Sequence, residues 1–246
     1  MGVSKTFKVL FFLTLCIFAT ISAAVDTLNR SATPPTISAL APNQIALERS
    51  TQSSVRVIST LFSEEQSGVT STSSGTYLEH KGETYILTTA HSIIGYCEDT
   101  FVIALELMYQ CEEFIMINQD DDIAVLKIGK IEDRVPVSIS KNIYPMEKVY
   151  KSLLIHDKFI YTGYPQGIGP FTFNGTVVSQ PEERGYVFAH SYAWSGSSGS
   201  GVFDTKGNLV GLITAVSVAN SEYGVDVMED LVIVTPVSLL DLQVVF

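Results

Sequence analysis

Residues 74–90 read SGTYLEHKGETYILTTA and contain two short runs rich in threonine, tyrosine and aliphatic residues, with Gly82 between them. Runs of β-branched and aromatic residues that are bounded by glycine are typical of strands joined by a turn. The stretch therefore predicts two neighbouring strands. Similar runs follow along the chain from residue 53 onward, whereas long stretches of helical periodicity are scarce, so the sequence favours an all-β fold.

The strand-like runs fall into two sets of six. The first set begins with SSVRVIST at residues 53–60 and ends with DIAVLKI at residues 122–128. The second set begins with KFIYTGYP at residues 158–165 and ends with DLVIVTPV at residues 230–237. Turn residues separate the runs at intervals of about 8–12 residues, which predicts a barrel or a sandwich. The turn-rich segment 131–157 would join the two halves.

The folded part is predicted as one domain at residues 53–246, with its halves at about 53–130 and 158–235. A chain that is 46% apolar and 17% charged can bury a sizeable core. A short closing helix is predicted for PVSLLDLQVVF at the C-terminus. Residues 25–52 mix Pro, Ser, Thr and Ala without a clear period, and we expect them to form an extended lead-in.

The N-terminus has the pattern of a secretory signal. Lys5 and Lys8 precede the uncharged run VLFFLTLCIFATISAA, which ends with the small residues Ser22 and Ala24. We expect cleavage after Ala24, so that residues 1–24 are a signal peptide and the mature protein is exported, either secreted or periplasmic. The alternative is an uncleaved membrane anchor, because the run approaches the ~17–25 residues that a spanning helix needs.

The chain is acidic. Its 15 Lys and Arg against 26 Asp and Glu give a formal net charge of -11, and loss of residues 1–24 with two lysines and no acids changes it to -13 (-11 - 2). An acidic surface repels phosphates, so nucleic acid is not an expected partner. The sequence shows no metal-ligand spacing, and no cofactor is expected.

Two cysteines, Cys97 and Cys111, remain once the signal peptide, which contains Cys16, is removed. An even number of cysteines in an oxidising compartment is typical of a disulfide. The predicted strand pairing argues against a bridge. If residues 101–105 pair with residues 113–117, the two cysteines lie near opposite ends of the hairpin, farther apart than the ~7 Å limit between bridged α-carbons. A disulfide and two free thiols therefore both stay open.

Three local segments carry candidate catalytic side chains. YILTTAHS places His91 after a strand, DDDIAVLKI places Asp122 at the start of one, and WSGSSGSGVFD places Ser198 between glycines. A serine hydroxyl needs a neighbouring imidazole to take its proton, and that imidazole needs a carboxylate to hold its tautomer and stabilise its cation. We therefore predict His91, Asp122 and Ser198 as a catalytic triad, and expect the neighbouring Asp120 and Asp121 to face solvent.

The backbone around Ser198 fits the same chemistry. The tetrahedral intermediate of acyl transfer carries a negative oxygen, which the backbone N–H groups of Gly196 and Ser198 could bind as an oxyanion hole. Gly196 suits this position because the chain must bend tightly with its N–H directed inward. GSSGSG alone would resemble a flexible linker, and the order His, Asp, Ser at three strand ends is what gives it meaning.

Together, TTAH, DIAVLKI and GSSGSGVFD resemble the trypsin-like (chymotrypsin-fold) serine peptidase superfamily, especially its bacterial HtrA-like and glutamyl endopeptidase-like branch. The gaps of 31 residues (122 - 91) and 76 residues (198 - 122) are similar to the compact HtrA-like form, and the resemblance covers roughly residues 53–240. It implies two six-stranded antiparallel β-barrels with the active site in the cleft between them. It also implies a secreted serine endopeptidase that hydrolyses peptides or proteins through an acyl-enzyme intermediate.

The sequence departs from this family pattern in three ways. Digestive trypsins have Asp before the nucleophile, which pairs with a newly cut N-terminus, whereas Ser197 stands here, so activation by that ion pair is not expected. Ser200 and Gly201 stand where the family usually has glycine and proline. HtrA enzymes usually carry a PDZ domain after the protease, and none is expected in this chain. The altered Ser200–Gly201 stretch supports the alternative function, a catalytically silent homologue that binds partners, although every triad residue is present.

The resemblance also implies substrate contacts beside the triad. Ile213, Thr214 and Ala215 would lie near the entrance of the primary specificity pocket. His190 and Tyr192 would approach it from the segment before the nucleophile, although packing or surface positions for these two stay open. Glutamyl endopeptidases would have a histidine where Ile213 stands, so a preference for acidic residues is not expected. We expect instead a small or medium apolar residue before the cleaved bond.

Two asparagines, Asn29 and Asn174, each begin the Asn-X-Ser/Thr pattern of glycosylation acceptors. The pattern would matter only in a source that glycosylates its secreted proteins.

Overall fold

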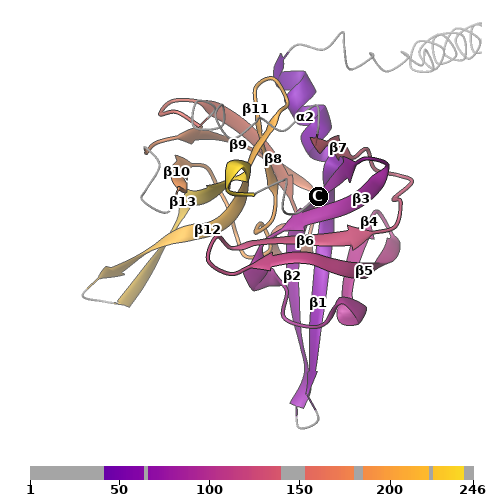
Figure 1. Ribbon diagram of the computed structural model, residues 1–246. Helices are drawn as coiled ribbons and strands as arrows, with labels where there is room; N and C mark the ends of the chain where they lie inside the picture. Colours follow the sequence, from indigo (N-terminus) through magenta and orange to yellow (C-terminus); the bar gives the residue numbers. More distant parts are fainter. Residues whose placement is uncertain (1–41, 64–65, 140–152, 180–184, 222–223, 241–246) are drawn as a thin grey trace, which may run out of the picture. The chain divides into compact units, whose positions relative to one another are not determined.

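The computed structural model in Figure 1 describes residues 42–63, 66–139, 153–179, 185–221 and 224–240. The predicted signal peptide and its cleavage point, most of the lead-in, Asn29 and the last six residues lie outside the described residues. None of the helices in the described part of the chain has the length and hydropathy of a membrane-spanning helix.

The first barrel is closed by six antiparallel strands in the order β1-β4-β5-β6-β3-β2, with β2 pairing back onto β1. A short strand, β7 (Val137–Ser138), adds to β2 in parallel. Inward-facing side chains such as Val57, Tyr77 and Leu126 fill the barrel. The six strands, indigo to magenta in Figure 1, are β1 (Ser54–Ser63), β2 (Gln66–His80), β3 (Glu83–Thr88), β4 (Thr100–Ala104), β5 (Leu107–Asn118) and β6 (Ile123–Ile128).

The second barrel has the closed order β10-β13-β12-β11-β8-β9. Its core contains Phe159, Tyr161, Val202 and Val234, all buried. The strands, orange to yellow in Figure 1, are β8 (Lys158–Gly163), β9 (Phe171–Val177), β10 (Val187–His190), β11 (Gly201–Asp204), β12 (Leu209–Ser221) and β13 (Gly224–Pro236). The predicted fold of two six-stranded antiparallel barrels is confirmed.

A further hydrophobic cluster joins the barrels, with Val125 contributed by the first and Phe203 by the second. Strand β6 is buried at four successive positions, 123–126. Because strand side chains alternate between faces, Leu126 enters the core of the first barrel while Val125 enters the cluster between the barrels. The unbroken apolar run IAVL is the consequence of burial on both faces.

Helix α2 (Pro42–Ser53) lies where we expected an extended lead-in, and that expectation was wrong for residues 42–52. Proline at the first helical position is favourable because its fixed φ suits a helix start. The buried positions are Ala46, Ser50 and Ser53, spaced by four and three residues on one face. Small residues form this face, and Ser50 Oγ donates to Thr162 Oγ1 at 2.7 Å, so the helix packs closely on β8 without an apolar period in its sequence.

The predicted closing helix is reduced, in the described residues, to one 3-10 turn, η5 (Val237–Leu239). The turn is fixed by the bond from the Leu240 N–H to the Val237 carbonyl at 3.1 Å. The rest of the predicted helix lies outside the described residues.

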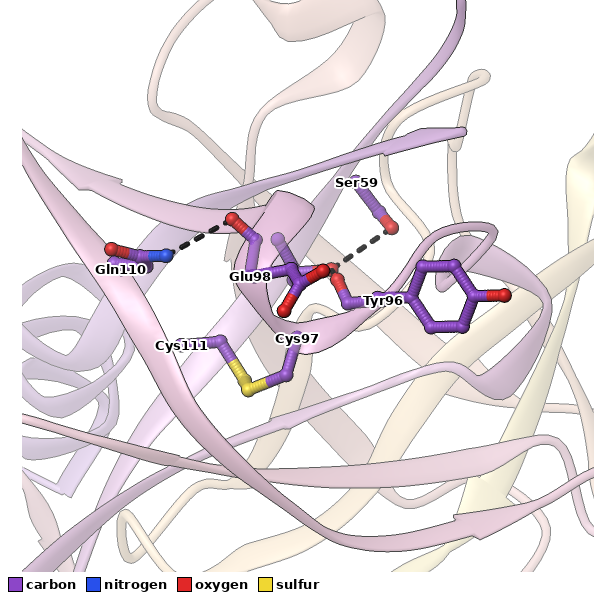
Figure 2. The surroundings of a disulfide bond; sticks show 7 residues. Ser59, Tyr96, Cys97, Glu98, Gln110 and Cys111 are labelled. Atoms are coloured by element: carbon purple, nitrogen blue, oxygen red, sulfur yellow. Dashed lines mark hydrogen bonds between the residues drawn. A yellow bond between two sulfur atoms is a disulfide. The ribbon is translucent and has the colours of Figure 1, made fainter. Parts of the chain in front are cut away.

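Cys97 and Cys111 form a disulfide with 5.2 Å between their α-carbons (Figure 2). The strand register that we predicted against it was wrong. Strand β4 pairs with the first third of β5, so that Phe101 lies opposite Gln110, and only the later part of β5 pairs with β6. Because β4 ends its pairing at Gln110, the next residue, Cys111, lies beside η3 (Cys97–Asp99), which directly precedes β4. Gln110 Nε2 also donates to the Glu98 carbonyl of this turn at 3.0 Å.

Replacing both cysteines, Cys97→Ser with Cys111→Ser, should lower the free energy of unfolding by about 3 kcal/mol, because a bridge closing a loop of roughly 15 residues restricts the unfolded chain by that amount. Urea unfolding of the oxidised protein and the double variant measures the difference. Adding a reductant should bring the unsubstituted protein to the stability of the variant and leave the variant unchanged. Equal stability of the two proteins under oxidising conditions would contradict the prediction.

Candidate active site

His91 and Asp122 stand at the ends of two paired strands. Strands β3 and β6 pair with Thr88 opposite Ala124, so the residues just after β3 and just before β6 meet at one edge of the first barrel. His91 lies in the turn η2 (Ala90–Ser92). Asp122 directly precedes β6 and has φ 54°, a left-handed conformation that aspartate adopts more readily than most residues. This turn aims its carboxylate back at η2.

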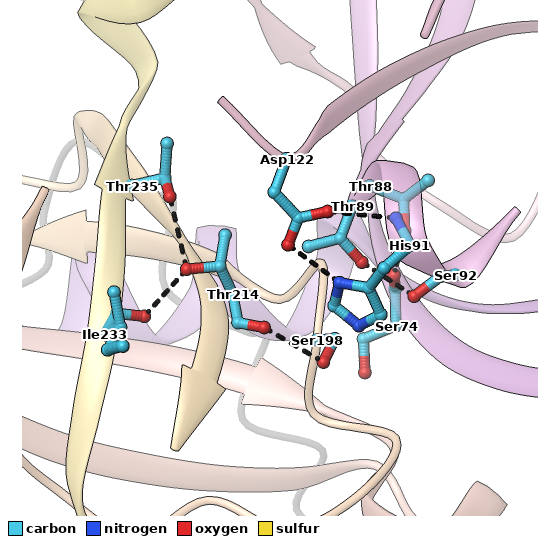
Figure 3. Close-up of polar contacts among 10 residues, drawn as sticks. All are labelled: Ser74, Thr88, Thr89, His91, Ser92, Asp122, Ser198, Thr214, Ile233 and Thr235. Carbon is cyan, nitrogen blue, oxygen red and sulfur yellow. Dashed lines mark hydrogen bonds and ion pairs between the residues drawn. The ribbon is translucent and has the colours of Figure 1, made fainter. Parts of the chain in front are cut away.

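The Asp122 carboxylate binds His91 at two points (Figure 3). Oδ1 accepts the backbone N–H of His91 at 2.9 Å, and Oδ2 lies 2.7 Å from its Nδ1. Two contacts from one carboxylate fix the position of the residue as well as the orientation of the ring. The two rival aspartates serve the turn instead, since Asp121 Oδ2 accepts from Asn118 Nδ2 at 2.7 Å and the Asp120 N–H donates to Asn118 Oδ1 at 3.0 Å.

Ser198 lies in a loop between β10 and β11 that is bonded to both barrels. Its carbonyl accepts the N–H of Ser74 from β2 at 2.8 Å, while the next N–H, of Gly199, donates to the Ile213 carbonyl of β12 at 2.8 Å. The Ser198 hydroxyl donates to the Thr214 carbonyl at 3.3 Å in this structure, and not to His91. Figure 3 shows its side chain beside the imidazole, and both line the same pocket.

The N–H groups of Gly196 and Ser198 have no acceptor among the residues that the structure describes. Gly196 has φ +94°, and a Cβ there would lie 2.6 Å from the Tyr164 carbonyl oxygen and 2.8 Å from the Gln166 nitrogen. Only glycine fits this conformation and this close approach. The loop therefore leaves two backbone donors available beside Ser198.

The predicted triad and three of the predicted substrate contacts meet in one pocket of about 300 Å³. Sequence reasoning missed several wall residues, although Trp194 lies inside the quoted segment WSGSSGSGVFD as the only tryptophan of the chain. The pocket is lined by His91, Asp122, Ala193, Trp194, Ser195, Ser197, Ser198, Ile213, Thr214, Ala215 and Val216.

Two predicted substrate contacts, His190 and Tyr192, do not line this pocket. His190 ends β10 opposite Leu231 and lines a separate pocket of about 450 Å³ together with Lys158. Tyr192 is 56% exposed and stacks on the indole of Trp194, with 6.4 Å between ring centroids. Side chains at His190 and Ala189 alternate across the strand, and Ala189 faces the core, so His190 points away from it.

The only strongly shifted pKa near the site belongs to Tyr161, among the residues that the structure describes. Burial raises the pKa of Tyr161 well above its usual range, and hydrogen bonds with Ser191 and Ser197 oppose this only in part. The hydroxyl therefore stays protonated under all ordinary conditions. Within the described ranges, no three metal-ligating side chains come together.

Comparison with known proteins places this geometry in a family. Residues 73–212, more than half of the chain, match the model of the trypsin-like peptidase domain. Among solved structures, the HtrA-type protease AlgW with a decapeptide is similar at a TM-score of 0.62 and 18% identity, over 81% of this chain and 66% of that chain. The same protease with a tripeptide is similar at a TM-score of 0.60 and 19% identity, over 83% of this chain and 61% of that chain.

The chain thus spans slightly less than two thirds of the length of these proteases, and at such identities the likeness shows the shared fold. No curated protein matches the chain. From the extent of the domain match, the chain belongs to the trypsin-like peptidase family.

Proposed function

We propose that this protein is a serine endopeptidase in which His91, Asp122 and Ser198 cleave peptide bonds through an acyl-enzyme intermediate. The observation that carries the proposal is the double contact of one carboxylate with His91, through its backbone N–H at 2.9 Å and its Nδ1 at 2.7 Å, inside the pocket that Ser198 lines. A carboxylate on Nδ1 keeps the proton on that nitrogen and leaves Nε2 free to act as a base.

The chemistry follows from this arrangement. Ser198 Oγ attacks the substrate carbonyl carbon while its proton passes to His91 Nε2, and the carbonyl oxygen becomes an oxyanion. The N–H groups of Gly196 and Ser198, which have no protein acceptor among the described residues, would bind that oxygen. The C–N bond then breaks, and the leaving amine takes the proton from His91. Water repeats the sequence on the ester, releasing the acid and restoring the Ser198 hydroxyl.

The walls of the pocket support a preference for a small or medium apolar side chain before the cleaved bond. Ala193, Ile213, Ala215 and Val216 contribute apolar surface, and among the described lining residues the only charged side chains are those of the proposed triad. A volume of about 300 Å³ suits a side chain of moderate size. The peptides bound to AlgW, a protease of similar fold, support peptides as the substrate class.

Export is part of the proposal. The Cys97–Cys111 bridge supports an oxidising compartment, where disulfides persist. Together with the signal-like residues 1–24, it favours a secreted or periplasmic enzyme. N-terminal sequencing of the exported protein distinguishes a mature start near Val25 from a retained membrane anchor.

One observation favours the alternative, a catalytically silent homologue that binds partners. The Ser198 hydroxyl is bonded to the Thr214 carbonyl and not to the imidazole. Catalytic hydrogen bonds are often long in ligand-free sites and tighten when substrate binds, so this contact alone does not decide between the two. Labelling with a fluorophosphonate probe distinguishes the active enzyme from the silent homologue.

A fluorophosphonate probe should label the folded protein once, on Ser198, because the probe requires a serine activated by a neighbouring base. Ser198→Ala should abolish the label and lower peptide turnover on the order of 10⁶-fold. Ser138→Ala serves as the control, since Ser138 belongs to β7 and does not line the pocket. Absence of label on the folded protein would favour the silent homologue.

Gly196→Ala should lower kcat by about 10²- to 10³-fold, the usual effect of losing one oxyanion-hole donor. The added Cβ would lie 2.6 Å from the Tyr164 carbonyl oxygen and would force the loop to move. Gly82→Ala is the matched control, because Gly82 also has a left-handed φ of +86° but has open space around it. Steady-state kinetics of both variants check the prediction, and equal turnover in the two would refute it.

A further inference from the structure

Tyr161 lies directly beneath the loop that carries Ser198. Its side chain belongs to the core of the second barrel and is completely buried, with its ring stacked on Phe173 at 5.1 Å between centroids. Its hydroxyl donates to the backbone carbonyl of Tyr192. The Ser197 hydroxyl accepts the Trp194 N–H at 3.3 Å and can donate its own proton to the same oxygen, whereas the Ser191 hydroxyl donates to the Asn174 carbonyl at 3.0 Å. One buried side chain therefore contacts both the beginning and the end of the segment 191–198.

This segment, which we call the nucleophile loop (residues 191–198), is also held by bonds to neighbouring strands and by one tight turn. Its first part is bonded to β13, through the Ser191 N–H to Asp230 and the Ala193 N–H to Glu229, both at 3.0 Å. Its last part is a tight turn closed by the Ser197 N–H on the Trp194 carbonyl at 2.9 Å. The Ser191 and Ser197 side chains are 2% and 1% exposed, so both hydroxyls are directed into the protein.

We propose that Tyr161 is a positioning residue that holds the nucleophile loop in the conformation in which the Gly196 and Ser198 N–H groups face the substrate. The inference rests on the proposed function, since it concerns the same site. Where digestive trypsins have an aspartate that pairs with the new N-terminus, this chain has Ser197, and the neutral hydroxyl of Tyr161 would link Ser197 to Tyr192 across the base of the loop.

This link from Tyr161 to Tyr192 and Ser197, which we call the brace, needs neither a charged group nor an N-terminus created by cleavage. A tyrosine hydroxyl has one donor and two acceptor sites, which suits a group that donates to a carbonyl and accepts from one serine hydroxyl, that of Ser197. Because the hydroxyl is buried and stays protonated, its bond to Tyr192 does not switch with pH. Both partners belong to the second barrel, so the loop takes its working shape when that barrel folds.

Tyr161→Phe tests the inference, with Tyr77→Phe as the matched control. Tyr77 is equally buried at 1% exposure, and its hydroxyl also has one backbone partner, the Ile131 N–H at 3.0 Å, but it belongs to the first barrel and does not line the active-site pocket. Tyr161→Phe should lower kcat/KM for a peptide substrate about 3- to 10-fold, the value of one hydrogen bond. The loss should appear in kcat, with KM little changed. Tyr77→Phe should leave both constants unchanged.

A second readout does not depend on activity. Trp194 is the only tryptophan of the chain and lies in the nucleophile loop, 38% exposed, with Nε1 donating to Glu229 Oε2 at 2.8 Å. Release of the loop in Tyr161→Phe should shift the emission of Trp194 to longer wavelength and increase its quenching by acrylamide. Tyr77→Phe should keep the emission of the unsubstituted protein.

Should Tyr161→Phe not fold, Ser197→Ala removes the other hydroxyl of the brace and should change turnover and Trp194 emission in the same direction. Unchanged kcat and unchanged emission in either variant would overturn the inference. Failure of the proposed function is a separate result, because it would appear as a lack of fluorophosphonate label on the unsubstituted protein. The emission of Trp194 would still decide whether Tyr161 holds the loop.

Discussion

Ser74 joins the two barrels at the point where the site forms. This residue of β2 is completely buried, and its N–H donates to the Ser198 carbonyl at 2.8 Å while its hydroxyl donates to the Gly196 carbonyl at 2.7 Å. The same hydroxyl accepts the Tyr164 N–H at 2.8 Å, and the Ser74 carbonyl accepts Thr88 Oγ1 at 2.7 Å. A buried network of this kind is stable only when every member has a partner. The carbonyls on both sides of Ser197 are thereby tied to the first barrel.

The position of the candidate nucleophile therefore depends on the docking of the barrels. His91 and Asp122 belong to the first barrel and are fixed by the pairing of β3 with β6, whereas Ser198 comes from the second. The apolar cluster between the barrels, with Val125 and Phe203 among its members, supplies the non-directional attraction. The hydrogen bonds of Ser74 fix the position of the loop of the second barrel relative to β2 of the first. Below the loop, Tyr161 would add support from within the second barrel, so that the loop is held from two sides.

Much of this could be predicted from the sequence because strand patterns and short motifs are local properties. Alternation in SGTYLEH and ETYILTTA locates β2 and β3, and the run IAVL after Asp122 locates a strand buried on both faces. Helix α2 could not be found in this way, because its buried face consists of Ala46, Ser50 and Ser53 and gives no apolar period. The disulfide was left open because the register of β4 on β5 depends on where the turn at Leu105 falls, which propensity alone does not determine.

The remaining parts of the site depend on tertiary contacts. The role that we assign to Tyr161 has no signal in KFIYTGYP, since the hydroxyl meets its partners more than 30 residues later in the chain, at Tyr192. The pocket that His190 lines could not be predicted for the same reason, because the face to which a strand residue points is decided by the whole barrel. By contrast, Gly196 could be predicted, since a bend with an inward N–H requires a residue without a Cβ.

The central claim is that the two barrels together place a base beside Ser198 and make it nucleophilic. Its most direct measurement is mass spectrometry of the protein quenched in acid during turnover of an activated ester. The account predicts one acyl group for each chain, located on the peptide that contains Ser198 and absent when His91→Ala is treated in the same way. An acyl group on another residue, or equal acylation of Ser198 in the His91→Ala variant, would contradict it.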